Sequence, residues 1–476
     1  MLRILYIVNN FHSSKIRDPL NAVKGIQTKE VGVVPTSDVI PLSNQISSHW
    51  SWSGETLRFD PGDGRLAETG VDWPKHGFTH VDAPCHMIQG GLTLDDCDLN
   101  QLCGEAAVVD VSDLVPSGAV NANVLEDRGN HVRAGDLLIL RSNLHEVHPN
   151  TTGDYWQKSP YVDADGSQWI VDRGCRALVI DFPQDYVARE MGGRLVTNPE
   201  FTEHQIVLGA NLMHLEHVVN LGAIKQDRVF LIGWPLRLPG ADGGPAGPIA
   251  LTSWPGPNPR IMDLSLPIAD NGTGKVATGL AKSFEAGDPV QETCVRFEGH
   301  SHTHVLTPKY IGAGGGVEDY IGAPLTRRAD IATLMDVANG ERVDVEQLAS
   351  AIPNPNSENM LLIHTGFSGR VSYDDPDWFA LSPCLTEAAA RWICSSGYKV
   401  VGADCELDEG RKTSGNRPAQ RHDLKAEAVL LEHGVCLLKN LCNLDMLDAG
   451  HPLVAAMPLN LPEAEAAPAR ILALEW

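Results

Sequence analysis

The sequence predicts a mixed α/β protein built from two tandem copies of one domain. Landmarks that recur at a nearly constant spacing indicate the duplication. Short apolar runs that alternate with fewer helical patterns indicate the α/β class, with more strand than helix. The length of 476 residues exceeds what one ordinary core accommodates, which also favours at least two domains.

The duplication is visible in four landmarks. Thr79-His80-Val81 recurs 224 residues later as Thr303-His304-Val305. Three others recur after 223 residues: Ile180-Asp181 through Asp185 as Ala403-Asp404 through Asp408, Pro235-Leu236 as Pro458-Leu459, and Pro245 as Pro468. A constant register over this much of the chain is hard to obtain by chance, so we infer a tandem repeat.

The landmarks also set the domain boundaries. We expect an N-terminal half at residues 37–253 and a C-terminal half at residues 258–476, joined by the Pro/Gly-rich stretch from Ser253 to Pro259. Residues 1–36 lie outside the repeat and are expected to form an N-terminal arm.

Apolar runs bounded by polar residues predict the buried strands of the N-terminal half, and periodic runs predict helices in the C-terminal half. The strands are expected at residues 106–111, 137–140, 178–181 and 229–233, and the helices at residues 386–394 and 424–432.

Composition limits the classes of partner. The formal net charge of −24 argues against nucleic acid or an anionic membrane as a partner, and it is the charge of a soluble protein. The partner that we expect is a small-molecule substrate. The ten cysteines contain no Cys-x-x-Cys pair, and no apolar run reaches the ~18 residues of a membrane span. The N-terminal apolar run lacks a small-residue cleavage site, so we expect a cytoplasmic protein.

Potential metal ligands are concentrated in residues 76–86, His-Gly-Phe-Thr-His-Val-Asp-Ala-Pro-Cys-His, which contain three histidines and one aspartate. On an extended segment His76, His80 and Asp82 would project from one face, because strand side chains alternate. Pro84 would then turn the chain and swing His86 back over this group. Imidazoles beside a carboxylate form a ligand set for zinc, manganese or iron.

Two further candidate ligands, His204 and Glu216, lie twelve residues apart. On one continuous helix they would be ~18 Å apart on different faces. The repeat places Asn211 where the C-terminal half has Gly434, and both residue types commonly end helices in a left-handed conformation. We therefore expect a helix that stops at Asn211 and a strand over residues 212–221, a reversal that could bring the two side chains together.

These residues carry a family resemblance. Residues 76–86 resemble the His-x-Gly-Thr-His-x-Asp-x-Pro-x-His signature of the metal-dependent cyclase/hydrolase family, to which kynurenine formamidases and isatin hydrolases belong. The sequence departs from it at Gly77-Phe78, where the family has a variable residue followed by glycine. The resemblance covers most of both halves. It implies a swivelling β/β/α fold that dimerises, so the fused halves would form a pseudo-dimer, on which a homo-oligomer could be built.

The resemblance also implies a ligand set. One metal ion would be bound by His76, His80 and Asp82, and a second by Asp82, His204 and Glu216, with Asp82 bridging. Zn²⁺ and Mn²⁺ both suit these ligands, with one or two ions per chain.

The C-terminal half has lost most of this set. Leu306, Tyr310, Glu427 and Lys439 stand where the N-terminal half has Asp82, His86, His204 and Glu216. Leucine cannot ligate a cation, and a lysine would repel one. The run His300-Ser-His302-Thr-His304 leaves open a different metal site on one strand face. We expect one active half beside a degenerate copy with a structural or regulatory role.

Three functions follow from this arrangement. The first is a hydrolase of an amide, formamide or lactam C–N bond, in which metal-bound hydroxide attacks and His86 acts as general acid/base. The second is a cyclase or dehydratase of a small metabolite or polyketide, and the third is a non-catalytic metal-binding scaffold. Trp50, Trp52 and Phe78 are candidates for an aromatic wall that would suit an aromatic or cyclic substrate.

Overall fold

The computed structural model describes residues 38–47, 49, 52, 55–59, 68–73, 76–190, 193–270, 276–410, 420–448 and 450–476. The expected N-terminal arm and Trp50 lie outside these ranges. All described residues belong to one compact unit that begins at Val33.

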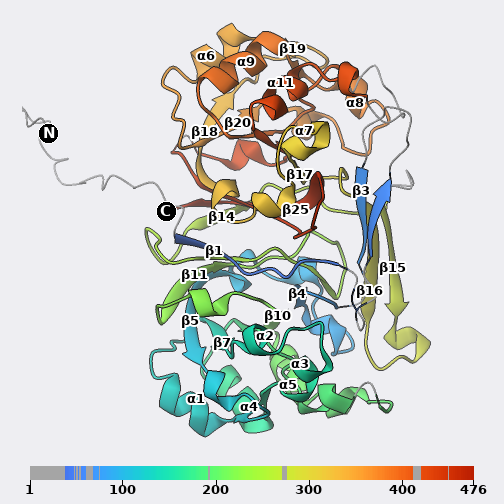
Figure 1. Cartoon of the computed structure of the whole chain (residues 1–476), viewed down its shortest axis with the longest axis vertical. Helices are drawn as coiled ribbons and strands as arrows, with labels where there is room; N and C mark the ends of the chain where they lie inside the picture. Colours follow the sequence, from blue (N-terminus) through green and yellow to red (C-terminus); the bar gives the residue numbers. More distant parts are fainter. Residues whose placement is uncertain are drawn as a thin grey trace, which may run out of the picture. The chain divides into compact units, whose positions relative to one another are not determined.

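Nine described strands form the sheet of the N-terminal half (Figure 1). In spatial order they are β1 (Val39–Pro41), β13 (Ile249–Leu251), β11 (Arg228–Ile232), β5 (Cys103–Asp110), β7 (Leu137–Arg141), β9 (Ala177–Ile180), β10 (Met213–Glu216), β4 (His80–Asp82) and β12 (Gly243–Pro245). The central strands from β5 to β10 run parallel, and β4 pairs antiparallel with β10. Strands β5, β7, β9 and β11 confirm the four apolar runs predicted as buried strands.

Eight described strands form the sheet of the C-terminal half. Their order is β14 (Arg260–Asp263), β25 (Ala466–Glu475), β17 (His304–Leu306), β23 (Cys436–Lys439), β22 (Val400–Ala403), β20 (Met360–His364), β18 (Thr326–Thr333) and β24 (Leu453–Pro458). Read from β24 to β25, this order repeats that from β11 to β12 in the first sheet, so the topology fits a tandem duplication.

Helices cover the outer face of each sheet (Figure 1). The described helices of the N-terminal half are α1 (Ala122–Arg128), α2 (Leu144–Val147), α3 (Gly153–Gln157), α4 (Ala164–Asp172) and α5 (Thr202–Val207). The helices described in full in the C-terminal half are α6 (Val345–Ala351), α7 (Phe367–Arg370), α8 (Trp378–Leu381), α9 (Glu387–Ser395) and α11 (Ala426–Glu432). Helices α9 and α11 confirm the two predicted helices. The Thr386 hydroxyl caps α9 by accepting a hydrogen bond from Ala389 N at 3.1 Å.

The inner faces of the two sheets share one apolar core. Buried side chains of both halves meet there, including Phe230 and Ile232 from β11 and Leu453 and Leu472 from β24 and β25. Trp476 packs edge-on against Phe230, with 5.5 Å between ring centroids. The halves therefore pack as a pseudo-dimer across a common hydrophobic interior.

A four-stranded sheet interleaves the halves at the side of the molecule (Figure 1). It consists of β15 (Val276–Lys282), β16 (Glu292–Glu298), β3 (Glu68–Trp73) and β2 (Glu55–Phe59). The central pair, β16 and β3, joins one strand from each half, with Val295 opposite Trp73. Each half thus extends a hairpin across the other.

Two sequence-based expectations about strands need correction. The segment from His76 is not extended, because His76 and Phe78 have positive φ angles of 53° and 59°, and the strand begins only at His80. The strand expected over residues 212–221 ends at Glu216, because His217 adopts φ 52°. The helix end at Asn211 is confirmed, with φ 60°.

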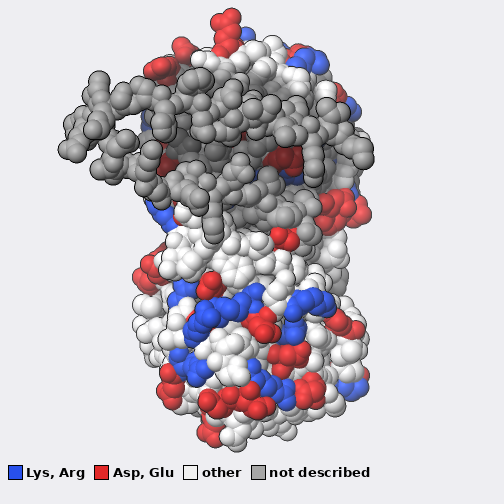
Figure 2. Space-filling model, turned by 90° about the vertical axis from the view of Figure 1, so that its left-hand side faces the viewer, with Lys and Arg blue, Asp and Glu red and all other residues white. Residues whose placement is uncertain are grey.

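The described helices include none with the length and hydropathy of a membrane span. All ten cysteines are free thiols. On the face shown in Figure 2, described Lys and Arg side chains lie among Asp and Glu side chains, so this face mixes both signs of charge.

Gly243 on β12 provides a test of how β12 is packed against residues 76–82. A Cβ atom at Gly243 would lie 2.6 Å from both the Val81 carbonyl oxygen and His76 Cε1. Because the backbone oxygen cannot move cheaply, we expect Gly243→Ala to lower the free energy of unfolding by about 1–3 kcal/mol in urea denaturation.

Gly244→Ala is the matched control for this substitution. Its Cβ would meet the end of the Leu238 side chain at 2.9 Å, and that side chain can change rotamer. We expect the smaller loss at Gly244, and equal losses at the two positions would contradict the packing described for β12.

Candidate metal centre

The centre is built on three neighbouring strands. Strand β4 lies between β10 and β12, and its register sets His80 opposite Glu216 and Asp82 opposite His214. Cross-strand partners share a face, and residues two apart on one strand share it too. The pairing therefore gathers two imidazoles and two carboxylates on one side of the sheet, all of them buried.

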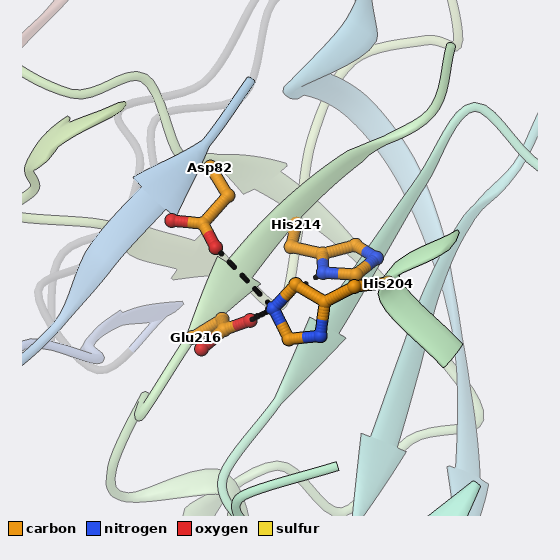
Figure 3. Close-up of side chains that lie close together, drawn as sticks. All are labelled: Asp82, His204, His214 and Glu216. Carbon is orange, nitrogen blue, oxygen red and sulfur yellow. Dashed lines mark ion pairs between the residues drawn. The ribbon is translucent and has the colours of Figure 1, made fainter. Parts of the chain in front are cut away.

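Helix α5 contributes His204 to the same side (Figure 3). His204 Nε2 lies 3.6 Å from Asp82 Oδ2 and 3.3 Å from Glu216 Oε1. With His214, these residues form a group whose ligating atoms all lie within 4.8 Å of one another. The helix stop at Asn211 makes this possible, because the reversal into β10 brings His204 back over Glu216.

His76 and His86 close the other side of the centre. His76 Nδ1 lies 2.5 Å from Asp82 Oδ1, and its ring stacks on that of His86 with 3.8 Å between centroids. His86 lies in a short 3-10 turn, Pro84–His86, whose proline ends the strand and reverses the chain. The structure thus brings together all six side chains that the sequence singled out as ligands or general acid/base.

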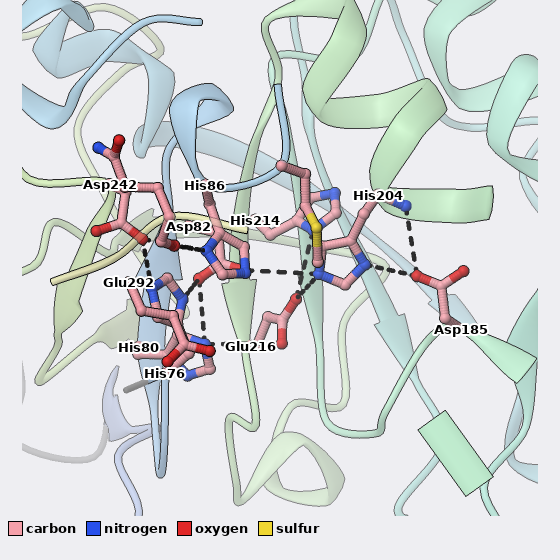
Figure 4. A network of polar contacts seen from close by, with 12 residues as sticks. His76, His80, Asp82, His86, Asp185, His204, His214, Glu216, Asp242 and Glu292 are labelled. Atoms are coloured by element: carbon pink, nitrogen blue, oxygen red, sulfur yellow. Dashed lines mark hydrogen bonds and ion pairs between the residues drawn. The ribbon is translucent and has the colours of Figure 1, made fainter. Parts of the chain in front are cut away.

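Each of two imidazoles is held by a carboxylate that the sequence analysis did not assign (Figure 4). Asp242 Oδ2 lies 2.8 Å from His76 Nε2, and Asp185 Oδ2 lies 2.5 Å from His204 Nδ1. The second ring nitrogen of each histidine faces Asp82. A carboxylate on the outward nitrogen fixes the tautomer and orientation of a metal-ligating histidine, so Asp242 and Asp185 are placed to orient ligands.

Comparison of the two halves of the sequence points to both Asp185 and Asp242. Asp185 recurs as Asp408 and Asp242 recurs as Glu465, so an acidic side chain occupies each position in both halves. Asp185 also accepts a hydrogen bond from Glu203 N at 2.9 Å and thereby caps the start of α5. Glu203, a third unassigned carboxylate, lies 3.1 Å from His214 Nε2.

His80 shows that the centre suits a cation. Its Nδ1 donates a hydrogen bond to the Phe78 carbonyl oxygen at 2.9 Å, which in a neutral imidazole leaves Nε2 with a lone pair. Nε2 is buried without a hydrogen-bond partner and faces Asp82 Oδ1 at 3.2 Å and Glu216 Oε2 at 3.7 Å. A lone pair directed at two carboxylates is unfavourable, and a cation between them would satisfy all three groups.

The directions of the pKa shifts in the centre also indicate that its carboxylates need positive charge nearby. Burial alone would raise the pKa of Asp82, but the neighbouring His76 and His86 hold it well below its ordinary value. Burial opposes protonation of His76, but Asp82 and Asp242 outweigh burial and raise its pKa well above normal. Burial likewise opposes protonation of His214, yet Glu203 raises its pKa to about 9. The buried carboxylates thus require positive charge nearby.

A cavity of about 780 Å³ opens onto the centre and carries an aromatic wall. Trp52 lines it and packs against Trp156, with 5.9 Å between ring centroids. Phe78 packs against Trp52 at 5.0 Å but is not itself part of the cavity lining, and Trp50 lies outside the described residues. Phe201 from the start of α5 also faces the cavity.

The equivalent place in the C-terminal half holds an ion pair instead. Lys439 Nζ lies 2.7 Å from Glu406 Oε2 and also pairs with Glu427, and all three residues are buried. Among the described residues, every group of His, Cys, Asp and Glu close enough to share a metal ion lies in the N-terminal half. The alternative of three histidines on one strand face is wrong, because His302 adopts φ 52° and the strand starts at His304.

One family model matches both halves of this chain, and several known proteins match less than half of it. A family model described as "Putative cyclase" matches residues 37–184 and 262–407. Kynurenine formamidase from Bacillus mycoides is 28% identical over 211 residues, which cover 43% of this chain and 91% of that protein. The Bacillus anthracis kynurenine formamidase is 26% identical with the same coverage.

Two solved structures are also similar. Isatin hydrolase A from Labrenzia aggregata is 18% identical, with a TM-score of 0.39 over 46% of this chain and 94% of that one. Isatin hydrolase A from Ralstonia solanacearum is 20% identical, with a TM-score of 0.38 over 45% and 92%. In each of these four comparisons, less than half of this chain matches more than 90% of the length of the relative.

We expect Asp82→Asn to reduce the bound divalent metal, because Asp82 is the carboxylate that faces four imidazoles of the centre, those of His76, His80, His86 and His204. Metal per chain, measured by mass spectrometry after purification, should fall well below the wild-type value. Glu427→Gln in the C-terminal half is the control and should leave metal content unchanged. Equal metal content in wild type and Asp82→Asn would contradict the assignment.

We expect Lys439→Met to destabilise the protein without changing its metal content. The substitution leaves Glu406 and Glu427 buried without their cation, which costs about 3–5 kcal/mol. Urea unfolding in the presence of a chelator measures this loss. Lys399→Met, at an exposed position, should cost little, and a similarly small effect at Lys439 would contradict the buried ion pair.

Proposed function

Because this chain belongs to the metal-dependent cyclase/hydrolase family, we propose that its N-terminal half hydrolyses the C–N bond of a small amide, formamide or lactam. The observation that supports this most directly is the convergence of His76, His80, Asp82, His204 and Glu216 beside a cavity with an aromatic wall. The relatives named kynurenine formamidase and isatin hydrolase agree with this reaction class.

The residues that would hold metal ions form two overlapping groups. His76, His80 and Asp82 form one, and Asp82, His204 and Glu216 form the other. A divalent ion bound there would lower the pKa of water to about 7 and polarise a substrate carbonyl. Zn²⁺ and Mn²⁺ both accept these ligands, and we propose one of them as the resident ion.

His86 is placed to move the proton. Its Nδ1 donates to the Gln291 carbonyl oxygen at 2.7 Å and lies 3.1 Å from Asp242 Oδ2. Nε2 is therefore the free nitrogen, and it lies 4.0 Å from Asp82 Oδ2 at the edge of the cavity. We propose that Nε2 takes a proton from the attacking water and delivers it to the leaving nitrogen, while Asp242 stabilises the imidazolium.

A cysteine nucleophile is not needed for this reaction. Cys85 is adjacent to His86, but burial raises the pKa of its thiol to about 12. The thiol group instead lies near the Ala241 carbonyl oxygen, at 4.0 Å. A buried, protonated thiol is a poor nucleophile.

The aromatic wall supports an aryl or cyclic substrate. Trp52 and Trp156 line the cavity together with Phe201, and His217 packs against Trp52 with 4.9 Å between ring centroids. Burial lowers the pKa of His217 to about 3, so this imidazole is neutral and adds to the apolar lining. An aryl formamide or an isatin-like lactam would match such a surface by stacking.

A cyclase or dehydratase is the second candidate, because the matching family model is itself described as a cyclase. Both reactions would use the same polarised carbonyl and the same proton carrier. Product analysis in ¹⁸O-labelled water separates them, since hydrolysis incorporates solvent oxygen and dehydrative ring closure does not.

We expect His86→Ala to lower kcat by about 10²–10⁴-fold while metal content stays at the wild-type level. Steady-state kinetics on aryl formamides and lactams, with metal quantitation on the same samples, measures both. Tyr310→Phe, at the equivalent position of the C-terminal half, is the control and should keep full activity. Unchanged turnover in His86→Ala would refute the role of His86, and a protein without turnover on any of these substrates would favour the scaffold function.

A further inference from the structure

The C-terminal half lacks the ligands of the candidate metal centre, but it contacts the metal centre of the N-terminal half. Strand β16 and the residue before it, Gln291, lie against the loop that carries His86. Lys282, Val290 and Glu292 from the β15–β16 hairpin belong to the lining of the same cavity as Trp52. Figure 4 shows Glu292 among the histidines of the centre.

Thr293, on strand β16, makes two hydrogen bonds to Asp242 of the N-terminal half. Its backbone N–H donates to Asp242 Oδ1 at 2.7 Å, and its hydroxyl donates to the same oxygen. Asp242 Oδ2 is then directed at His76 Nε2 and His86 Nδ1. Asp242 and Thr293 are both buried, so these bonds are shielded from water. One oxygen of this carboxylate is held by the C-terminal half, and the other orients two imidazoles.

The equivalent contact is present at the corresponding position of the repeat. Thr69, on strand β3 of the N-terminal half, donates through its backbone N–H and its hydroxyl to the two oxygens of Glu465, both at 2.6 Å. Glu465 in turn lies 3.4 Å from His300 Nε2. Each half thus holds the acidic residue of the other. Only one of these acids faces the described group of metal-ligating side chains.

We propose that Thr293 is a positioning residue for the N-terminal centre, and that the C-terminal half is a working part of the active site through this residue. The inference rests on the proposed function, because it assigns Thr293 to the same metal centre. Thr293 sets the direction of Asp242, and Asp242 sets the tautomer and direction of His76 and His86. Partners that orient a ligating histidine typically change metal affinity or activity 10–100-fold when removed.

The test compares Thr293→Val with Thr69→Val in the full-length protein. Each substitution removes one hydroxyl that donates to a buried carboxylate, so their effects on folding should be similar. For Thr293→Val we expect affinity for Zn²⁺, measured by competition with a chromophoric chelator, to fall about tenfold. We expect kcat to fall as well, with KM nearly unchanged, because the hydroxyl does not contact the cavity. Thr69→Val should keep the wild-type Zn²⁺ affinity and kcat.

Thr293→Ser provides the rescue, because it restores the hydroxyl donor and should return Zn²⁺ affinity to within about twofold of wild type. Thermal unfolding of all three variants in chelator shows whether stability alone separates them. Equal Zn²⁺ affinity and kcat in Thr293→Val and Thr69→Val would overturn the inference. A wild-type protein that binds neither Zn²⁺ nor Mn²⁺ would refute the proposed function itself, and this inference with it.

Discussion

The need to compensate buried negative charge dominates this structure. Asp82, Asp185, Glu203, Glu216 and Asp242 are buried close to one another in the N-terminal half. Burying a carboxylate without a partner costs several kcal/mol, so a cluster of buried carboxylates is stable only when positively charged groups lie next to it. Imidazoles supply that charge in the structure described here, and a divalent cation would supply it more compactly.

The C-terminal half meets the same electrostatic problem with a covalently attached cation. Lys439 places an ammonium group where the N-terminal half has the carboxylate of Glu216, and Glu427 replaces His204. The substitutions are mutually consistent, because a carboxylate and a lysine can pair where a histidine and a carboxylate would bind metal. The degenerate half therefore keeps its packing without a metal ion, and its loss of ligands need not have cost it stability.

Much of the centre could be predicted from the sequence, because the predictive signals were local or repeated. The histidines of residues 76–86 are close in sequence, and the repeat located the helix end at Asn211. The family resemblance then implied that His204 and Glu216 meet as ligands. The positive φ of His76 could not be predicted. The repeat marks position 242 as acidic in both halves, but Asp242 follows His76 by 166 residues and is held by Thr293 from the other half, so its contact with His76 could not be predicted from periodicity or spacing.

The interleaved hairpins have a consequence for assembly. If the halves were separate proteins, Thr293 would reach Asp242 only after two molecules had met, and the site would come apart on dilution. One chain converts that encounter into an intramolecular one, with an effective concentration set by the linker from Ser253 to Pro259. Fusion also frees the two surfaces from the requirement to be identical, so one copy could exchange its ligands for Lys439 while still serving its neighbour.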